Sequence, residues 1–258
     1  MEQTIEDINH QIKHCTFCCL NKTRQNAVCG EGPVPSKIMI IAQAPGRKED
    51  KEAKMLIGPS GTVFDKLIHS ADLKRENIYI TNLLKCFLPN CRKPRRDEMN
   101  ICYRRYLQKE IELVKPEIIV TLGYHVTKFI FSQNGLKVPN RIEFKSTFGQ
   151  LLTAKNRKIV PLRHPATVVH NSTNLNKLSD EYAILKTVQS KCRYFAQCVI
   201  PEKYKNGLIP KDLLDKYCHG NWKRCNRYHA YNKGLHPNDS VLPESELHYL
   251  PISPNRQA

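Results

Sequence analysis

Residues 37–46 are Lys37-Ile38-Met39-Ile40-Ile41-Ala42-Gln43-Ala44-Pro45-Gly46. The first half is short, apolar and rich in β-branched side chains, which is typical of a buried strand in a parallel sheet. The second half is a turn of small residues with Pro and Gly, which lets a ligand approach the backbone at the carboxyl end of a strand. This stretch predicts an α/β protein with a ligand site at that edge of its sheet.

Three further segments, 78–81, 117–122 and 159–160, repeat the strand pattern. Helices are expected at about 60–70, from an N-cap at Asp97 to about Leu113, from Gly123 to about Phe131 and at about 174–190. Residues 133–157 are expected to be irregular and hairpin-like. Strands that alternate with helices predict a three-layer α/β/α sandwich with a mainly parallel central sheet.

Composition favours a basic protein of the cytoplasm. The chain has 258 residues and a formal net charge of +17, and both 1–190 (+12) and 191–258 (+5) are basic. Such a charge favours a polyanionic partner, because neutralising phosphates releases counterions. No apolar run approaches the roughly 18 residues that cross a membrane, and the N-terminus lacks the pattern of a secretory signal. We therefore expect a cytoplasmic protein with no membrane partner.

The character of the chain changes after Ser190, so we expect one domain over 1–190 and a small extension over 191–258. Within 34 residues the extension holds the only Trp of the chain and four of its eleven cysteines, Cys192, Cys198, Cys218 and Cys225. A segment too small for its own core is often stabilised by a metal, so we expect a second metal site, zinc or iron–sulfur. His219 could replace one cysteine, and the alternative is reduced cysteines in a packed extension.

The N-terminal part holds a different cysteine pattern. Cys15 and Cys18 form a C-x2-C pair, Cys86 follows the second expected strand, and Cys102 lies early in the next expected helix. Two thiolates in one turn can bind a metal centre that two distant cysteines complete. Zinc suits four thiolates equally well. The spacing alone also allows a chance C-x2-C beside two unrelated buried cysteines.

The residues around these cysteines carry a resemblance. The sequence Cys15-Thr16-Phe17-Cys18-Cys19-Leu20-Asn21-Lys22-Thr23-Arg24, with Gly30-Glu31-Gly32 after it, closely resembles the opening of the family 4 uracil-DNA glycosylases. The resemblance continues through 42–50, 58–61, 80–86, 92–94 and 115–123 and ends at His164-Pro165-Ala166, about 180 residues in all. It implies a [4Fe–4S] cluster on Cys15, Cys18, Cys86 and Cys102. Cys19, Cys29 and Cys91 are expected to be ordinary thiols.

The resemblance also implies roles for residues at the carboxyl edge of the sheet. Asn82 would read N3–H and O4 of a flipped uracil, and His164 would donate to O2 as negative charge develops there. Gln43 and the backbone of Ala44 to Gly46 would face the sugar or the attacking water. Residues 165–171 would enter the duplex. The expected DNA contacts are Lys85, Arg163, Ala166 and Thr167, together with Arg92 and Lys93.

Two residues depart from the family pattern. The family has Glu in place of Gln43, and Gln can neither act as a base nor balance a sugar cation. Leu56 takes the place of the Phe on which uracil stacks, and base stacking is worth about 1–3 kcal/mol. Glu49 and Asp50 are retained and would position water or a backbone turn.

The resulting hypothesis is a monomeric DNA repair glycosylase that excises uracil, or a related deaminated base, and leaves an abasic site. It would be monofunctional, without a lysine Schiff base. The alternative is a catalytically weakened or inactive DNA-binding iron–sulfur protein of the same fold. A third interpretation is a zinc protein whose basic surface binds RNA or a protein.

Overall fold

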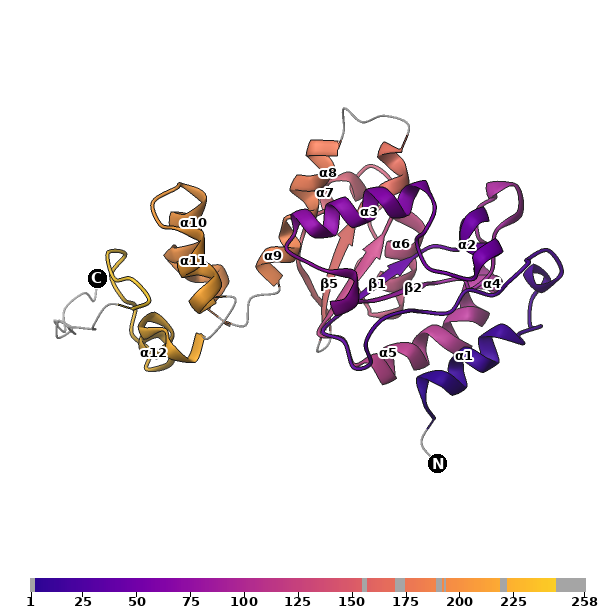
Figure 1. The fold of residues 1–258 in the computed structure, drawn as a ribbon, viewed down its shortest axis with the longest axis horizontal. Coiled ribbons are helices and arrows are strands. Elements are labelled where there is room, and N and C mark those ends of the chain that lie inside the picture. The colour runs from indigo at the N-terminus through magenta and orange to yellow at the C-terminus, as the bar shows by residue number, and fades with distance from the viewer. Residues whose placement is uncertain are drawn as a thin grey trace. The chain divides into compact units, whose positions relative to one another are not determined.

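The computed structural model describes residues 3–154, 157–169, 175–188, 192, 194–218 and 222–244. The chain forms two compact units, Met1–Lys186 and Thr187–Ala258. The first unit contains the sheet and most of the helices (Figure 1). His219 and residues 170–171 of the expected duplex-entering loop lie outside the described residues.

A five-stranded sheet with the order β2-β1-β3-β5-β4 forms the centre of the first unit. Its strands are β1 (Ile38–Ala42), β2 (Tyr79–Asn82), β3 (Ile118–Leu122), β4 (Leu152–Ala154) and β5 (Arg157–Leu162). All neighbouring pairs are parallel except β4 with β5. The mainly parallel sheet is therefore confirmed, and the irregular region contributes its antiparallel edge strand. Since Ala42 is in register with Asn82, the ends of β1 and β2 meet at one edge.

Helices cover both faces of this sheet (Figure 1). Side chains alternate along a strand, so Met39 and Ile41 of β1 face one layer and Ile38 and Ile40 face the other. Met39 and Ile41 share a buried cluster with residues of α5 (Gln108–Val114) and α6 (Tyr124–Gln133). The opposite layer holds α3 (Pro59–Ser70), which contacts α8 (Leu175–Tyr182). The three-layer sandwich is confirmed.

The boundaries of several helices differ from those expected. The helix expected to begin after an N-cap at Asp97 starts two residues earlier, as α4 (Arg96–Cys102) with its N-cap at Arg95, and Glu98 accepts from the Arg95 N–H at 2.9 Å. It continues through a π-helical segment, Tyr103–Leu107, into α5. The helix expected at 174–190 is divided into α8 and α9 (Ile184–Val188). A short α7 (Phe144–Thr147) lies in the region expected to be irregular.

Helices α1 (Ile5–Lys13) and α2 (Arg47–Glu52) of the first unit were not predicted from the sequence. In α1, Thr4 and Asp7 form a capping box and Ile8 and Ile12 are buried, so the cap pattern could have identified it. In α2, every residue is charged, which gives no apolar periodicity. This helix begins directly after Gly46 and places Glu49 and Asp50 inside the protein.

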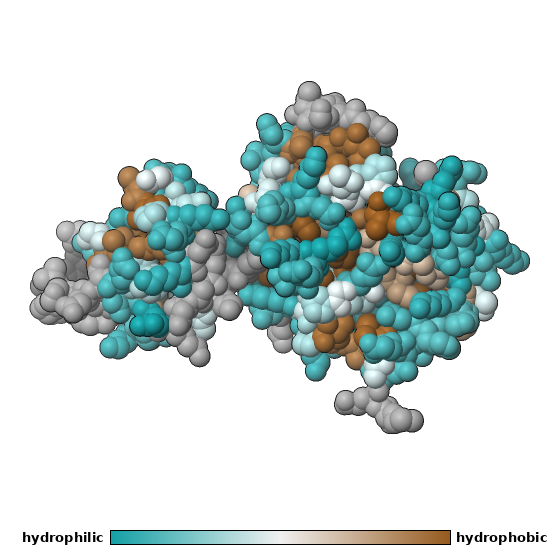
Figure 2. Space-filling model, viewed as in Figure 1, coloured by the Kyte–Doolittle hydropathy of each residue, from teal (hydrophilic) through white to brown (hydrophobic). Residues whose placement is uncertain are grey.

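The second unit contains α10 (Val199–Lys205), α11 (Lys211–Leu213), a π-helical segment, Leu214–Cys218, and α12 (Asn226–Asn232). Its core combines aliphatic, aromatic and cysteine side chains. The visible surface of the protein is mostly hydrophilic, with apolar patches between polar side chains (Figure 2). In the described ranges, none of the helices has the length and apolar character needed to span a membrane.

Candidate active site

A small pocket lies at the carboxyl edge of the sheet. Its volume is about 110 Å³, whereas a single water needs about 10–15 Å³. It is lined by Ala44, Pro45, Gly46, Glu49, Met55, Leu56, Ser60, Asn82 and His164. These residues come from the turn after β1, from α2, from residues 55–60 and from the ends of β2 and β5. The fold thus brings six of the predicted site residues together, Ala44, Gly46, Glu49, Leu56, Asn82 and His164.

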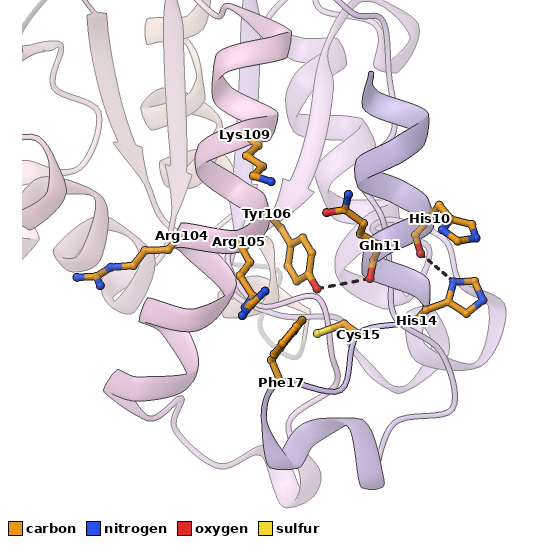
Figure 3. Close-up of a pocket in the computed structure, with 9 residues that line it drawn as sticks. All are labelled: His10, Gln11, His14, Cys15, Phe17, Arg104, Arg105, Tyr106 and Lys109. Atoms are coloured by element: carbon orange, nitrogen blue, oxygen red, sulfur yellow. Dashed lines mark hydrogen bonds between the residues drawn. The ribbon is translucent and has the colours of Figure 1, made fainter. Parts of the chain in front are cut away.

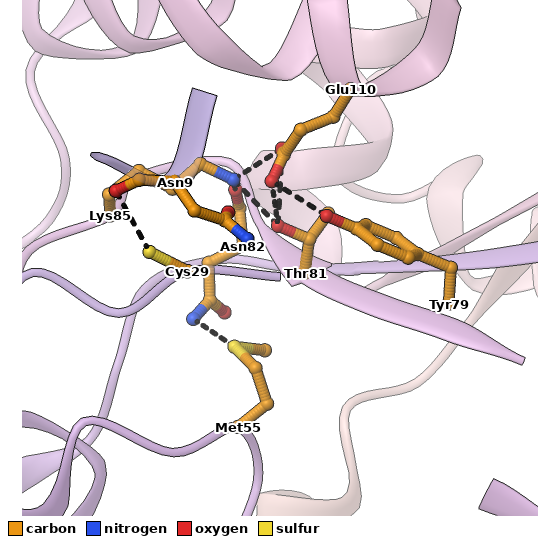
Figure 4. A network of polar contacts seen from close by, with 8 residues as sticks. All are labelled: Asn9, Cys29, Met55, Tyr79, Thr81, Asn82, Lys85 and Glu110. Carbon is orange, nitrogen blue, oxygen red and sulfur yellow. Dashed lines mark hydrogen bonds and ion pairs between the residues drawn. The ribbon is translucent and has the colours of Figure 1, made fainter. Parts of the chain in front are cut away.

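Asn82 presents a carboxamide at the end of β2. The residue is 2% exposed, and its Nδ2 donates to the Sδ of Met55 at 3.2 Å (Figure 4). A thioether is a weak acceptor, so a carbonyl oxygen in the pocket could take this donor at little cost. No hydrogen bond joins Oδ1 of Asn82 to another described residue. The side chain therefore offers one donor and one acceptor to a planar amide.

His164 stands at the end of β5 with a defined tautomer. Its Nδ1 accepts from the backbone N–H of Ala166 at 3.1 Å. Because an N–H can only donate, Nδ1 carries no proton and Nε2 carries the single proton of the neutral ring. Burial lowers the pKa of His164 to about 4, although the charge of Glu49 acts in the opposite direction. At neutral pH the ring is therefore an uncharged donor.

Glu49 holds the backbone of the opposite pocket wall. One oxygen, Oε1, accepts from the N–H groups of Ile57 at 3.0 Å and Gly58 at 2.8 Å. The other, Oε2, lies where a side-chain carbon at position 46 would meet it, so a residue larger than Gly46 would have to displace the Glu49 carboxylate. Of the two roles expected for Glu49, positioning a backbone turn is the one that these contacts support. Asp50 acts similarly on another loop, where it accepts from the N–H groups of Gln25 and Asn26.

Leu56 forms an apolar wall of the pocket and is 6% exposed. Its φ of +47° lies in the left-handed region, which costs a residue other than glycine about 1–3 kcal/mol. The surrounding contacts hold it there. Arg75 donates to the carbonyls of Met55 at 2.7 Å and Leu56 at 2.8 Å, and Glu31 accepts from the Met55 N–H at 2.8 Å. Arg75 was not identified from the sequence, and Glu31 was recognised only within the Gly30-Glu31-Gly32 motif, without a predicted role at the pocket.

Gln43 lies beside the pocket rather than in its lining. The residue is half-buried, and its carbonyl accepts from the Leu84 N–H at 3.0 Å. No hydrogen bond joins its carboxamide to another described residue. The side chain is therefore not fixed by the fold in the way that Glu49 is.

The side chain of Lys85, which was expected to contact DNA, is buried. Its side chain is 1% exposed and its ammonium donates to Glu110 at 2.5 Å, Thr81 at 2.6 Å and the carbonyl of Asn82 at 2.9 Å (Figure 4). Glu110 also accepts from the hydroxyl of Tyr79 at 3.2 Å. All three ammonium protons have partners inside the protein, so Lys85 has none left for a DNA phosphate. Its ion pair instead supports the strand that carries Asn82.

The other predicted DNA contacts are more accessible. Ala166 and Thr167 are exposed in the turn after His164, and the Thr167 hydroxyl donates to the His164 carbonyl at 2.9 Å. Arg163 is paired with Glu181 at 3.1 Å. Arg92 forms an ion pair with Glu98, while Lys93 is exposed.

The sequence analysis named Lys93 as a DNA contact but did not identify the other basic residues around it. Burial, and then the charges of Lys93, Lys128 and Arg141, lower the pKa of His125 at the start of α6. Lys128 and Arg141 are exposed, like Lys93. These residues therefore form a cationic surface around the N-terminus of α6.

The four N-terminal cysteines lie in one apolar cluster. Cys15, Cys86 and Cys102 are buried in it and Cys18 packs against it. Burial raises the pKa of Cys102 to about 12, and the nearby sulfurs of Cys86 and Cys18 also raise it. Arg24 donates from Nη1 to the Cys86 sulfur at 3.0 Å. Across the described ranges, no three His, Cys, Asp or Glu side chains converge on one point as ligands of a single metal ion would.

Two of the cysteines expected to be ordinary thiols have other partners. Cys19 donates to Glu98 and Cys29 donates to the carbonyl of Asn9, both at 3.5 Å. The side chain of Cys91 lies outside the described residues. The four C-terminal cysteines form a separate group in the second unit.

A second hollow of about 500 Å³ lies beside Cys15 (Figure 3). Its lining includes the exposed ring of Phe17, with the guanidinium of Arg105 3.2 Å from the ring centre. Arg104 and Lys109 add positive charge. This hollow shares no residue with the pocket around Asn82 and His164.

Sequence comparison with known proteins identifies the family of this chain. A sequence model of the Uracil DNA glycosylase superfamily matches residues 29–188. A type-4 uracil-DNA glycosylase of Sulfurisphaera tokodaii is 36% identical over 69% of this chain and 81% of its own length. The corresponding proteins of Saccharolobus solfataricus (36%, over 71% and 85%) and Thermotoga maritima (32%, over 67% and 87%) are similar to this chain as well. The chain therefore belongs to the uracil DNA glycosylase superfamily and, within it, to the type-4 group.

Proposed function

We propose that this protein excises uracil, or a closely related deaminated base, from DNA by hydrolysis of the N-glycosidic bond. The observation that carries the proposal is the pairing of Asn82 and a neutral His164 in one pocket. A base in a duplex cannot reach such a pocket, so the nucleotide must be flipped out of the stack.

Asn82 supplies the recognition of the base. Its Oδ1 would accept from N3–H, and its Nδ2 would leave Met55 and donate to O4. Cytosine presents an acceptor at N3 and a donor at position 4, so its pattern is the reverse. Leu56 would pack against the face of the ring. The hydrogen-bond pattern therefore selects uracil against cytosine, while the apolar contact contributes affinity.

His164 supplies the stabilisation of the leaving group. When the C1′–N1 bond breaks, its electron pair moves to the base, and negative charge collects on O2 and N1. The Nε2–H of His164 would donate to O2, and a fixed donor in a water-poor pocket stabilises such an oxyanion strongly. Water adds to C1′ and loses a proton, and the uracil anion takes up a proton, directly or through solvent, so the products are the neutral free base and an abasic sugar.

Gln43 restricts the rate of hydrolysis that the site can reach on the sugar side of the bond. A carboxamide can orient the attacking water by a hydrogen bond, but it takes no proton and does not balance the positive charge that develops on the sugar. We therefore expect slower turnover than a carboxylate at this position would give. Glu49 acts as a positioning residue, because its contacts hold the wall that carries Leu56.

The N-terminal cysteines fit an iron–sulfur cluster. Cys15, Cys18, Cys86 and Cys102 supply four sulfurs in one apolar cluster, and Arg24 adds a positive charge beside Cys86. A [4Fe–4S] cluster binds one thiolate at each iron, so its ligands do not converge on a single point. Such a cluster would tie the segment after α1 to α4 and would supply structural stability. The pocket is lined by other residues, so no step of hydrolysis needs it.

DNA binding would use the cationic surface around α6. Lys93, Lys128 and Arg141 offer charges to the phosphate backbone, and the first N–H groups of a helix bind anions. Ala166 and Thr167 are exposed next to His164. They would face the space that the flipped nucleotide leaves in the base stack. Binding should weaken steeply with salt, because each neutralised phosphate releases counterions.

The test is release of free base from a uracil-containing oligonucleotide at excess enzyme. His164→Ala should lower the single-turnover rate by about 10²–10³-fold, since it removes an oxyanion donor. Asn82→Ala should lower kcat/KM by roughly 10–100-fold, since two hydrogen bonds of about 1 kcal/mol each are lost. The matched controls are His69→Ala and Asn77→Ala, which change exposed residues. Salt-sensitive DNA binding without release of any deaminated base would instead support the inactive DNA-binding protein.

A further inference from the structure

The second unit builds its core on cysteine. Cys192, Cys218 and Cys225 are buried in the same cluster, and Cys198 packs against it. The four cysteines come from positions 192 to 225 of the chain, and the fold of this unit gathers them in and against one cluster. A unit of roughly 70 residues has a core of limited stability, and natural proteins of this size often add disulfides or a structural metal. Four cysteines gathered in such a core indicate that a bound group stabilises this unit.

A buried arginine, Arg227 of α12, contacts this cysteine group. It is 1% exposed, and its guanidinium donates to the carbonyls of Asn238 at 2.6 Å, Val241 at 2.9 Å and Pro237 at 3.3 Å. Its Nε donates to the Cys198 sulfur at 3.4 Å. No carboxylate is among its described partners. Because a buried cation is costly without a counter-charge, negative charge is expected on the neighbouring sulfurs.

The two cysteine groups of the chain are built alike. In the first unit, Arg24 is held by the carbonyls of Lys13 and Cys15 and donates to the Cys86 sulfur. In the second, Arg227 is held by three carbonyls and donates to the Cys198 sulfur. A π-helical segment adjoins each group, after Cys102 in one and ending at Cys218 in the other. Such segments are frequent at functional sites.

We propose that Cys192, Cys198, Cys218 and Cys225 bind a second metal centre as four thiolates, with Arg227 as a positioning residue that balances their charge. Each thiol loses its proton to solvent as its sulfur binds the metal. The metal would stabilise the second unit, so metal binding and folding of this unit would be coupled. The centre is separate from the base pocket, because the two share no residue.

Four thiolates can bind a zinc ion or a [4Fe–4S] cluster, and two observations favour the cluster. The spacing is C-x5-C-x19-C-x6-C, without the short C-x2–4-C pair that is usual in zinc fingers. In the described residues no three cysteine side chains converge on one point, as the ligands of one zinc ion would, whereas a [4Fe–4S] cluster binds one thiolate at each iron. The experiment therefore measures both metals.

The first measurement uses the full-length wild-type protein, purified without oxygen from cells supplied with iron and zinc. Iron, acid-labile sulfide and zinc are counted per chain. The proposal predicts about eight iron atoms, or about four iron atoms and one zinc ion. Full occupancy at about four iron atoms with no zinc would overturn it, and this result does not depend on the folding of any variant.

The second measurement assigns the metal to its ligands. Cys198→Ser with Cys225→Ser should remove the second metal and leave about four iron atoms, seen by metal analysis and visible absorption. Cys19→Ser is the control, because Cys19 is an exposed cysteine outside both groups. Unchanged metal content in the double variant would refute the assignment.

Arg227→Gln tests the positioning role. Loss of the charge should weaken retention of the second metal against a chelator by about 10–100-fold, as for other residues that support metal ligands. Arg227→Lys, which keeps the charge, should restore part of this retention. Arg224→Gln is the control at an exposed arginine of the same unit. Equal metal retention in all variants would contradict the role. None of these results depends on uracil release, so failure of one proposal is distinguishable from failure of the other.

Discussion

Glu49 could act as a positioning residue or as a catalytic base, and the variant Glu49→Gln separates these two roles. Gln keeps the shape and one acceptor oxygen, so the N–H groups of Ile57 and Gly58 retain a partner. Their bonds change from a charged to a neutral acceptor, a loss of about 1 kcal/mol each. The free energy of unfolding should therefore fall by about 2 kcal/mol. Glu49→Ala should cost more, about 1–3 kcal/mol for each buried N–H left without a partner.

The assay pairs chemical denaturation with single-turnover uracil release. If Glu49 positions the wall at Leu56, Glu49→Gln should retain uracil release within about tenfold, while Glu49→Ala should lose both stability and release. A residue that acts as the general base would behave differently, because losing it costs about 10²–10⁴-fold in rate. A large loss of rate in Glu49→Gln at unchanged stability would refute the reasoning.

Further predictions concern four other positions. Lys85→Met should lower the free energy of unfolding by about 3–5 kcal/mol in chemical denaturation, because it leaves a buried carboxylate unpaired, whereas exposed Lys93→Met should change it by less than about 0.5 kcal/mol. Equal effects would contradict the buried ion pair. Leu56→Phe should lower KM about fivefold through stacking, and Gln43→Glu should raise kcat by about tenfold or more; if neither improves uracil release, these substitutions do not limit the enzyme. The pKa of His164 is lowered from 6.5 to about 4, so the folded enzyme excludes a proton that the unfolded chain binds between these values. His164 should therefore contribute stability above about pH 6.5 that is lost as the pH falls toward 4, and its part in uracil release should persist to about pH 5. A rate that falls near pH 6.5 in wild type, but not in His164→Ala, would contradict the neutral ring.

Much of the fold followed from the sequence because its strands are short apolar runs with turn residues after them. The runs at 38–42 and 118–122 are buried along their whole length, so their burial agrees with their pattern. Asn82 at the end of β2 and His164 after β5 could be placed at one edge for a similar reason, since the carboxyl ends of parallel strands meet there, while the family resemblance supplied their roles. Helix α2 was missed because its six residues are all charged, and tertiary contacts of Glu49 and Asp50 stabilise it instead of an apolar face.

The support around the site could not be predicted in this way. Arg75 and Glu31 contact the same short segment from different parts of the chain. Arg75 lies in no recognised motif, and the Gly30-Glu31-Gly32 motif does not indicate which backbone group Glu31 contacts. Lys85 was misassigned because a lysine next to site residues resembles a phosphate contact until its partner is known. That partner, Glu110, lies 25 residues away on helix α5. Pairings of this kind depend on the tertiary fold, which a single sequence does not display.

The central claim is that the pocket between Asn82 and His164 removes uracil from DNA. The most direct measurement is mass spectrometry of the free base released in a single turnover by the wild-type protein. Two oligonucleotides that differ only in one uracil or cytosine serve as substrates. We expect free uracil and one abasic site for each uracil, and no release of cytosine. Absence of free uracil at saturating enzyme, or equal release of both bases, would contradict the account.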